Sequence, residues 1–247
     1  MTEILSVKSL SKSYGKTVAV DGISFNVRPN EIVGLLGPNG AGKTTTISML
    51  LGVLKPDAGS IYIEGMDLRG SRSCAISRTN FTAVYTPLPG NMTLEENLRI
   101  FARIWGVKDV PGRVDKVIEE FDLAGFRNKK CGLFSSGEQT RAGLAKAMLN
   151  EPNLLLLDEP TASLDPSTAE EIRGKIRKFV SRSSGGVLWT SHNMYEVEAV
   201  CDRVLFLSRG KILLEGDPKT LPAEHGKKTL EELFIKIARE PLTVGVF

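Results

Sequence analysis

A glycine-rich stretch near the N-terminus of this 247-residue chain has the composition of a phosphate-binding turn. Residues 37–45 match the pattern G-x-x-x-x-G-K-[ST]. Glycines let the turn curl so that successive backbone N–H groups point at phosphate oxygens, and Lys43 adds a positive charge. The Thr44 hydroxyl suits Mg²⁺ as a ligand. The candidate phosphate-binding residues are Gly37, Pro38, Asn39, Gly40, Ala41, Gly42, Lys43, Thr44 and Thr45.

The flanking residues place a strand before this stretch and a helix after it. The apolar run 32–36 precedes the stretch, and 47–51 follows it with helix-like spacing. A helix that begins here directs the positive end of its dipole toward the same anion. A plain connection is the alternative, but a lysine and a threonine in register with this pattern argue against it. The stretch therefore predicts binding of a nucleoside triphosphate.

Two adjacent carboxylates end a second apolar run. Residues 154–157 are all leucine, and Asp158 and Glu159 follow them directly. Successive side chains of a strand point to opposite sides, so Asp158 can reach a Mg²⁺ ion while Glu159 faces the terminal phosphate and orients a water molecule. Solvated turn residues are the alternative, but the phosphate-binding stretch upstream favours a catalytic pair.

Ser135 and Gly137 lie at the start of a predicted helix. The stretch 134–141 reads Phe-Ser-Ser-Gly-Glu-Gln-Thr-Arg, and apolar residues recur after it at helical spacing. A serine cap followed by glycine leaves N–H groups free at a positive helix end, which suits a second phosphate contact. The octapeptide alone favours an ordinary serine N-cap, so the other motifs decide between the two readings.

Composition and charge are those of an ordinary globular chain. Hydrophobic residues make up 41% and charged residues 25%, and no apolar run approaches the roughly 20 residues that span a bilayer. The N-terminus shows no signal-peptide pattern, so we expect a cytosolic protein. A net charge of +3, spread along the chain, predicts no nucleic-acid binding and leaves membrane association to a protein partner. Cys74, Cys131 and Cys201 lack metal-ligand spacing and are expected to be reduced structural thiols.

Short strands are expected around the phosphate-binding stretch. Alternating or glycine-bounded apolar residues mark strands over 4–14, 23–27 and 59–65, which predict a small antiparallel β lobe. From Thr93 apolar residues recur at three- and four-residue spacing. This spacing indicates an α-helical insertion over about 93–150.

The rest of the chain returns to an α/β pattern. Apolar runs 154–157 and 187–190 enclose the helix-like segment 168–180, which is typical of parallel strands with a crossover. A hairpin is expected over 205–214, followed by an amphipathic helix from 229 with a capping box at its start. The apolar face of that helix either covers its own domain or meets a partner.

The order of these motifs is similar to that of one protein family. The chain resembles the nucleotide-binding subunit of ATP-binding cassette (ABC) transporters over nearly its whole length. The resemblance is carried by 37–45, 134–139, 158–159, the Ser-Leu-Asp turn 163–165 and His192. It implies an α/β fold with a P-loop NTPase (RecA-like) core, an antiparallel β lobe and an inserted α-helical subdomain.

The resemblance also implies how the chain is divided. A single ABC ATPase domain is expected over 1–220, with the α/β core and β lobe at about 1–85 and 151–220 and the α-helical insertion at about 86–150. Residues 221–247 are expected to form a linker and a C-terminal amphipathic helix.

The family's functional residues transfer by resemblance onto matching positions of this chain. Tyr14 would stack on adenine, Thr44 and Asp158 would hold Mg²⁺, and Lys43, Glu159 and His192 would be catalytic. Ser135, Ser136, Gly137 and Glu138 would form the signature that binds ATP held by a second subunit, and Asp165 would cross the dimer interface.

The sequence departs from the family pattern at two places. The signature reads F-S-S-G-E instead of the commonest L-S-G-G-Q, so Ser136 must adopt a right-handed backbone conformation and Glu138 replaces an amide. The family's glutamine before the helical insertion is missing, because Gln139 is the only glutamine in the chain. Thr86, within 84–87, is a candidate to supply a hydroxyl to Mg²⁺ or water instead.

The resemblance implies a Mg-dependent ATPase that uses ATP and Mg and works on the cytoplasmic face of a membrane. Its expected partners are integral membrane subunits encoded as separate chains and a second nucleotide-binding subunit, in a head-to-tail homodimer or a pair with a similar subunit. By resemblance the membrane subunits dock on 87–105, although an apolar stripe at helical spacing is more often a core face than a docking groove. The pattern from His192 onward and the tail from Thr229 resemble exporter-type (ABC-2) systems. A soluble ABC ATPase that acts on ribosomes or DNA is one alternative, and a P-loop kinase or GTPase switch is another.

Overall fold

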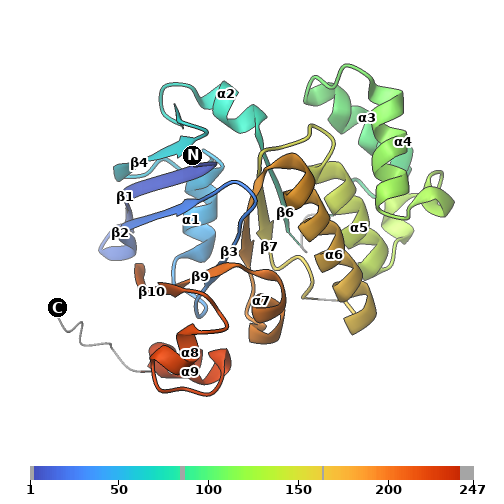
Figure 1. Cartoon of the computed structure of the whole chain (residues 1–247). Coiled ribbons are helices and arrows are strands. Elements are labelled where there is room, and N and C mark those ends of the chain that lie inside the picture. The colour runs from blue at the N-terminus through green and yellow to red at the C-terminus, as the bar shows by residue number, and fades with distance from the viewer. Residues whose placement is uncertain (1–2, 84–86, 163, 240–247) are drawn as a thin grey trace.

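The computed structural model describes residues 3–83, 87–162 and 164–239 (Figure 1). Its named strands form two sheets. One has four strands in the order β2-β1-β4-β5, and the other has six in the order β10-β9-β3-β8-β7-β6.

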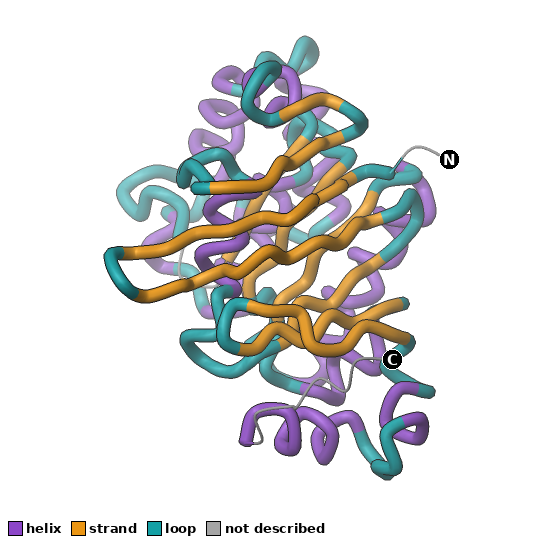
Figure 2. The backbone as a smooth tube through the Cα atoms, turned by 90° about the vertical axis from the view of Figure 1, so that its left-hand side faces the viewer, coloured by secondary structure: helices purple, strands orange, loops and turns teal. Residues whose placement is uncertain are grey.

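The four-stranded sheet is antiparallel throughout and confirms the predicted β lobe (Figure 2). Its strands are β1 (Leu5–Tyr14), β2 (Thr17–Val27), β4 (Ala58–Ile63) and β5 (Met66–Asp67). β2 is longer than the predicted strand, which began at residue 23. It begins at Thr17 because pairing with β1 continues to the turn, where Tyr14 lies opposite Thr17. The prediction left out the short apolar stretch 18–20, of which only Val20 is buried.

The six-stranded sheet contains the two parallel strands that the apolar runs 154–157 and 187–190 predict, together with three that those two runs do not. β3 (Ile32–Leu36), β6 (Thr79–Ala83), β7 (Leu154–Asp158), β8 (Gly186–Thr190) and β9 (Arg203–Ser208) are parallel. β10 (Lys211–Gly216) pairs antiparallel with β9 and completes the predicted hairpin. The carboxyl ends of parallel strands share one edge of a sheet. The residues that follow β3, β7 and β8 are therefore brought together there.

Helices flank both sheets and fill the segment between β6 and β7. Outside that segment, and before the two C-terminal helices, lie α1 (Lys43–Leu50), α2 (Arg72–Ser77), α6 (Pro166–Ser183) and α7 (Met194–Val200). Within it lie α3 (Leu94–Ile104), α4 (Val110–Glu120) and α5 (Ser136–Ala147), with 3₁₀ turns at Ala124–Phe126 and Cys131–Leu133. Capping boxes begin α3 and α5, at Thr93 and Ser135. The helical spacing over 93–150 is thus confirmed.

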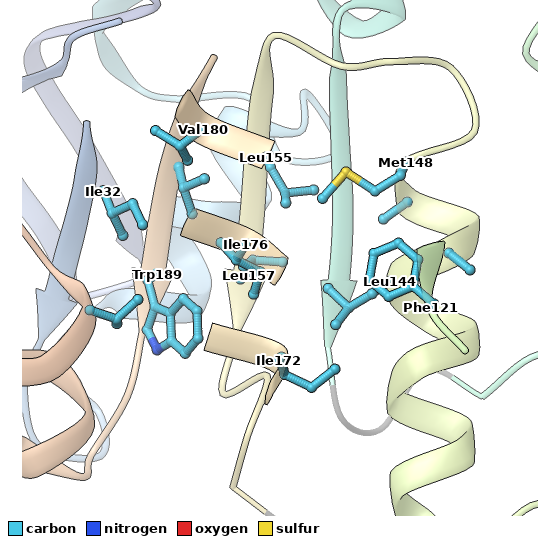
Figure 3. Packing of buried hydrophobic residues seen from close by; sticks show 14 of the residues in the cluster. Ile32, Phe121, Leu144, Met148, Leu155, Leu157, Ile172, Ile176, Val180 and Trp189 are labelled. Atoms are coloured by element: carbon cyan, nitrogen blue, oxygen red, sulfur yellow. The ribbon is translucent and has the colours of Figure 1, made fainter. Parts of the chain in front are cut away.

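Buried residues form two hydrophobic clusters, and one of them includes the packing of α6 on the parallel strands (Figure 3). The buried residues of α6 recur every three or four positions, at Ala169, Ile172, Ile176 and Val180. They meet β7 and β8, where Leu155, Leu157 and Trp189 are fully buried. Removal of apolar side chains from water stabilises this arrangement by about 25 cal/mol per Å². It also fixes the strand ends that carry the candidate site.

The final helices pack on their own domain. α8 (Leu221–Glu224) leads to α9 (Leu230–Arg239), which buries Leu230, Leu233 and Ile237. The Phe234 ring lies 6.0 Å from the Phe206 ring of β9. One of the two predicted roles of this helix, covering the domain, is therefore observed.

The start of α9 differs from the predicted capping box. The Glu232 N–H donates to Thr229 Oγ1 at 3.1 Å, as expected. The Glu232 carboxylate, however, accepts from the Lys228 N–H at 3.0 Å, one residue before the cap.

No helix in the described residues is long and apolar enough to cross a bilayer.

Candidate nucleotide-binding and catalytic site

The glycine-rich stretch connects β3 to α1 and lies tightly against two other strands. A Cβ atom at Gly37 would lie 2.2 Å from the carbonyl oxygen of Leu207 in β9. Gly42 has a φ of 111°, and a Cβ there would lie 2.4 Å from the carbonyl oxygen of Ala19 in β2. Glycine is therefore required at both positions by close approach, and at Gly42 also by the left-handed backbone. The turn is held in one shape between the two sheets.

Lys43 begins α1 and reaches back over the turn. Its Nζ donates to the Gly37 carbonyl at 2.5 Å and to the Pro38 carbonyl at 3.2 Å. Burial lowers the pKa of the Lys43 ammonium, and the Glu159 and Asp158 carboxylates partly oppose that shift. A cation is thus positioned beside the backbone N–H groups at the start of a helix, an arrangement suited to phosphate oxygens.

A cleft of about 290 Å³ joins this turn to the end of β7. It is lined by Ala19, Asn39, Gly40, Ala41, Gly42, Lys43, Thr44, Thr45, Asp158 and Glu159. The hydroxyl of Thr44 and the carboxylate of Asp158 supply hard oxygen donors of the kind that Mg²⁺ prefers. The donor set therefore fits a Mg²⁺ ion bound together with phosphate.

Glu159 turns away from the line of β7 and meets His192. Its φ of 54° is left-handed, and its N–H donates to both the carbonyl and the hydroxyl of Thr190, each at 3.1 Å. Its Oε2 lies 2.7 Å from His192 Nδ1, which makes an ion pair when the imidazole is protonated. The His192 side chain is 71% exposed. The structure thus brings together two residues that lie 33 positions apart in the chain.

Thr190 is a residue of the site that sequence reasoning missed. Its hydroxyl donates to Asp158 Oδ1 at 2.5 Å and accepts from the Glu159 N–H, so one side chain orients both adjacent acids. Asp158 and Thr190 are also paired in the parallel register of β7 and β8. The sequence signal that could have identified Thr190 is its position as a polar residue at the end of the apolar run 187–190.

The signature residues begin α5 and lie outside the cleft. Ser135 Oγ accepts from the Glu138 N–H at 3.3 Å, and Glu138 Oε2 accepts from the Ser135 N–H at 3.0 Å. The hydrogen bond from Lys129 to Glu138 is the main cause that holds the pKa of that carboxyl below its usual value. Ser136 is the first residue of α5 and has the required right-handed backbone. The acid in place of an amide therefore serves as a helix cap paired with Lys129.

Asp165 caps α6 at an exposed position. Its carboxylate accepts from the Ser167 and Thr168 N–H groups at 3.1 and 3.0 Å and from the Thr168 hydroxyl at 2.6 Å. The hydrogen bond from the Thr168 hydroxyl is the main cause that lowers the pKa of Asp165.

Tyr14 is half-exposed at the end of β1 and does not line the cleft. Thr86, the candidate for the missing glutamine, lies outside the described residues.

A parallel sheet with a glycine-rich turn after β3, Lys43 in that turn and paired acids after β7 defines a P-loop nucleoside triphosphatase. The family model "ABC transporter" matches residues 20–162. Curated relatives agree with that match. The "Nod factor export ATP-binding protein I" of Burkholderia pseudomallei is 38% identical over 230 residues, which cover 92% of this chain and 75% of that protein. The chain therefore belongs to the ABC transporter family.

Two further likenesses describe the same class of subunit. The "Probable multidrug ABC transporter ATP-binding protein YbhF" of Escherichia coli is 35% identical over 244 residues, 96% of this chain and 42% of that protein. A solved "ATP binding subunit of ABC transporter" superposes with a TM-score of 0.85 at 28% identity, over 96% of this chain and all of that one. The predicted fold class is thereby confirmed, and the chain is an ATP-binding subunit with the ATPase activity of its family.

Proposed function

We propose that this chain hydrolyses MgATP to power an export system, in which it pairs with membrane subunits encoded as separate chains. The observation that carries this proposal is the convergence of Lys43, Asp158, Glu159 and His192 at one sheet edge. The direction of transport rests on the relatives, whose names specify Nod factor export and multidrug transport. Those names favour transport over action on ribosomes or DNA.

The phosphate-binding turn, the two acids of the cleft and His192 beside it each have a proposed task in the reaction. The N–H groups of the turn and Lys43 would bind the β- and γ-phosphates and stabilise charge on the transferred group. Thr44 and Asp158 would hold Mg²⁺, which when bound neutralises phosphate charge. Glu159 would orient the attacking water, and His192, in contact with Glu159, would position that carboxylate and meet the γ-phosphate.

We infer that two such subunits act as a head-to-tail dimer. The signature residues Ser135–Glu138 lie on α5, outside the cleft of their own chain, at a helix N-terminus suited to an anion. Asp165 is likewise exposed and available to a partner. A second chain in opposite orientation would bring its signature to this cleft. Membrane subunits would hold the dimer at the cytoplasmic face, and residues 86–150 would form the insertion that docks with them.

Purification of the full chain from native membranes tests the proposal. We expect an integral membrane protein to co-purify and ATP hydrolysis to stop when EDTA removes divalent cations. Restoration by added Mg²⁺ is the control, because the two oxygen donors, Thr44 and Asp158, require a hard cation. Hydrolysis that persists without divalent cations, or a chain that associates with ribosomes instead of a membrane protein, would contradict the proposal.

Stacking of Tyr14 on adenine predicts a difference between two substitutions. Tyr14→Ala should weaken ATP binding by ~1–3 kcal/mol, and Tyr14→Phe should preserve it, because the ring and not the hydroxyl makes the contact. A fluorescent ATP analogue titrated against each variant measures the change. Equal affinities for the two variants would remove Tyr14 from the nucleotide site.

A further inference from the structure

We infer that Glu196 is a positioning residue that holds Glu159 and His192 in register. This inference rests on the proposed catalytic roles of those two residues. Glu196 lies in the first turn of α7 with 6% of its surface exposed. A buried carboxylate is costly unless hydrogen bonds or charges compensate it. Its partners therefore show what the carboxylate does.

A single oxygen of Glu196 joins the two segments that carry the proposed catalytic pair. Oε2 accepts from the Thr161 hydroxyl at 2.7 Å and from the Ser191 hydroxyl at 3.2 Å. Thr161 follows Glu159 by two residues, and Ser191 directly precedes His192. The other oxygen lies 3.9 Å from a guanidinium nitrogen of Arg173 in α6. The carboxylate thus links the β7–α6 connection, the β8–α7 connection and α6.

Helix capping does not account for Glu196. The spacing of Asn193 and Glu196 is that of a capping box, in which the glutamate would accept from the Asn193 N–H. That N–H instead donates to Ser191 Oγ at 3.0 Å. Asn193 Oδ1 alone caps α7, by accepting from the N–H groups of Tyr195 and Glu196. The Glu196 carboxylate is directed into the interior, toward the β7–α6 and β8–α7 connections.

The consequence for catalysis follows from the contact between Glu159 and His192. Their 2.7 Å approach requires that the two connections keep a fixed separation. A shift of about 1 Å in a catalytic group costs about 10²-fold in rate. Loss of the Glu196 bridge would free both connections, whereas the phosphate-binding turn, which it does not contact, would stay in place.

Glu196→Ala in the full chain tests this inference. We expect kcat for ATP hydrolysis to fall by about 10- to 100-fold, with ATP affinity within about threefold of the parent. Glu196→Gln should recover most of kcat, because its amide oxygen still accepts from Thr161 and Ser191. Glu198→Ala is the matched control, since Glu198 lies on the same helix but accepts from the Leu230 N–H of α9 at 3.3 Å.

A double-mutant cycle separates positioning from loss of stability. In a His192→Ala background, Glu196→Ala should cost less than about threefold, because coupled residues act non-additively. Equal losses in both backgrounds, or a folded Glu196→Ala chain with parental kcat, would overturn the inference. If Glu196→Ala does not fold, Thr161→Val carries the test: a loss of kcat supports the bridge, and parental kcat refutes it. Failure of the proposed function itself would show separately, as a Glu159→Gln chain that still hydrolyses ATP.

Discussion

Glu159→Gln should reduce ATP hydrolysis by about 10²- to 10⁴-fold while MgATP still binds. Glutamine keeps the shape of the side chain but cannot accept a proton from the attacking water. The binding groups of the turn and Lys43 are unchanged, so the variant should accumulate with ATP bound as a dimer. Rapid-quench assays and equilibrium binding of labelled ATP measure the two effects separately.

Glu151→Gln provides a matched control for this experiment. Glu151 also has a left-handed backbone, with a φ of 49°, and it also lies beside β7. It is at the opposite end of that strand, where its carboxylate contacts Arg113 at 3.0 Å. Its substitution should therefore leave hydrolysis at the parental rate. A Glu159→Gln chain that turned over ATP as fast as Glu151→Gln would refute the assignment of Glu159 as the catalytic carboxylate.

Lys43→Ala and Ser135→Arg chains should each be inactive alone and should regain activity when mixed. Lys43→Ala removes the cation of the turn, and Ser135→Arg blocks the helix N-terminus that a partner's ATP would approach. In a head-to-tail heterodimer both lesions fall in one site, and the second site is intact. Hydrolysis should then rise to about half of the parental rate per heterodimer if the sites act independently.

Lys43→Ala mixed with Glu159→Gln is the control for complementation. Both residues lie in the cleft of the same chain, so this heterodimer carries one lesion in each site and should stay inactive. Rescue in this second mixture would contradict the placement of Lys43 and Glu159 in the same site. A parent chain whose specific activity stays constant down to concentrations at which it is monomeric would contradict the shared site as well.

Much of the architecture could be predicted because it depends on local patterns. The leucine run 154–157 is buried on both faces, so continuous hydrophobicity identifies β7 without reference to any neighbour. The turn at 37–45 is equally local, since its glycines and Lys43 act within one short segment. The β lobe was recognised where apolar side chains alternate, and the predicted β2 was too short because most residues of its first half, 17–22, are exposed.

The catalytic arrangement depends on residues far apart in the chain and could not be read from such patterns. Glu159 and His192 meet only because β7 and β8 are parallel neighbours in register, and Thr190 orients both acids for the same reason. Glu196 fits the spacing of a helix cap, yet its carboxylate is buried between two connections and bonds to Thr161 and Ser191 instead. Hydrogen-bond partners of a buried carboxylate are chosen by which polar groups packing brings within reach, and packing is a property of the whole fold.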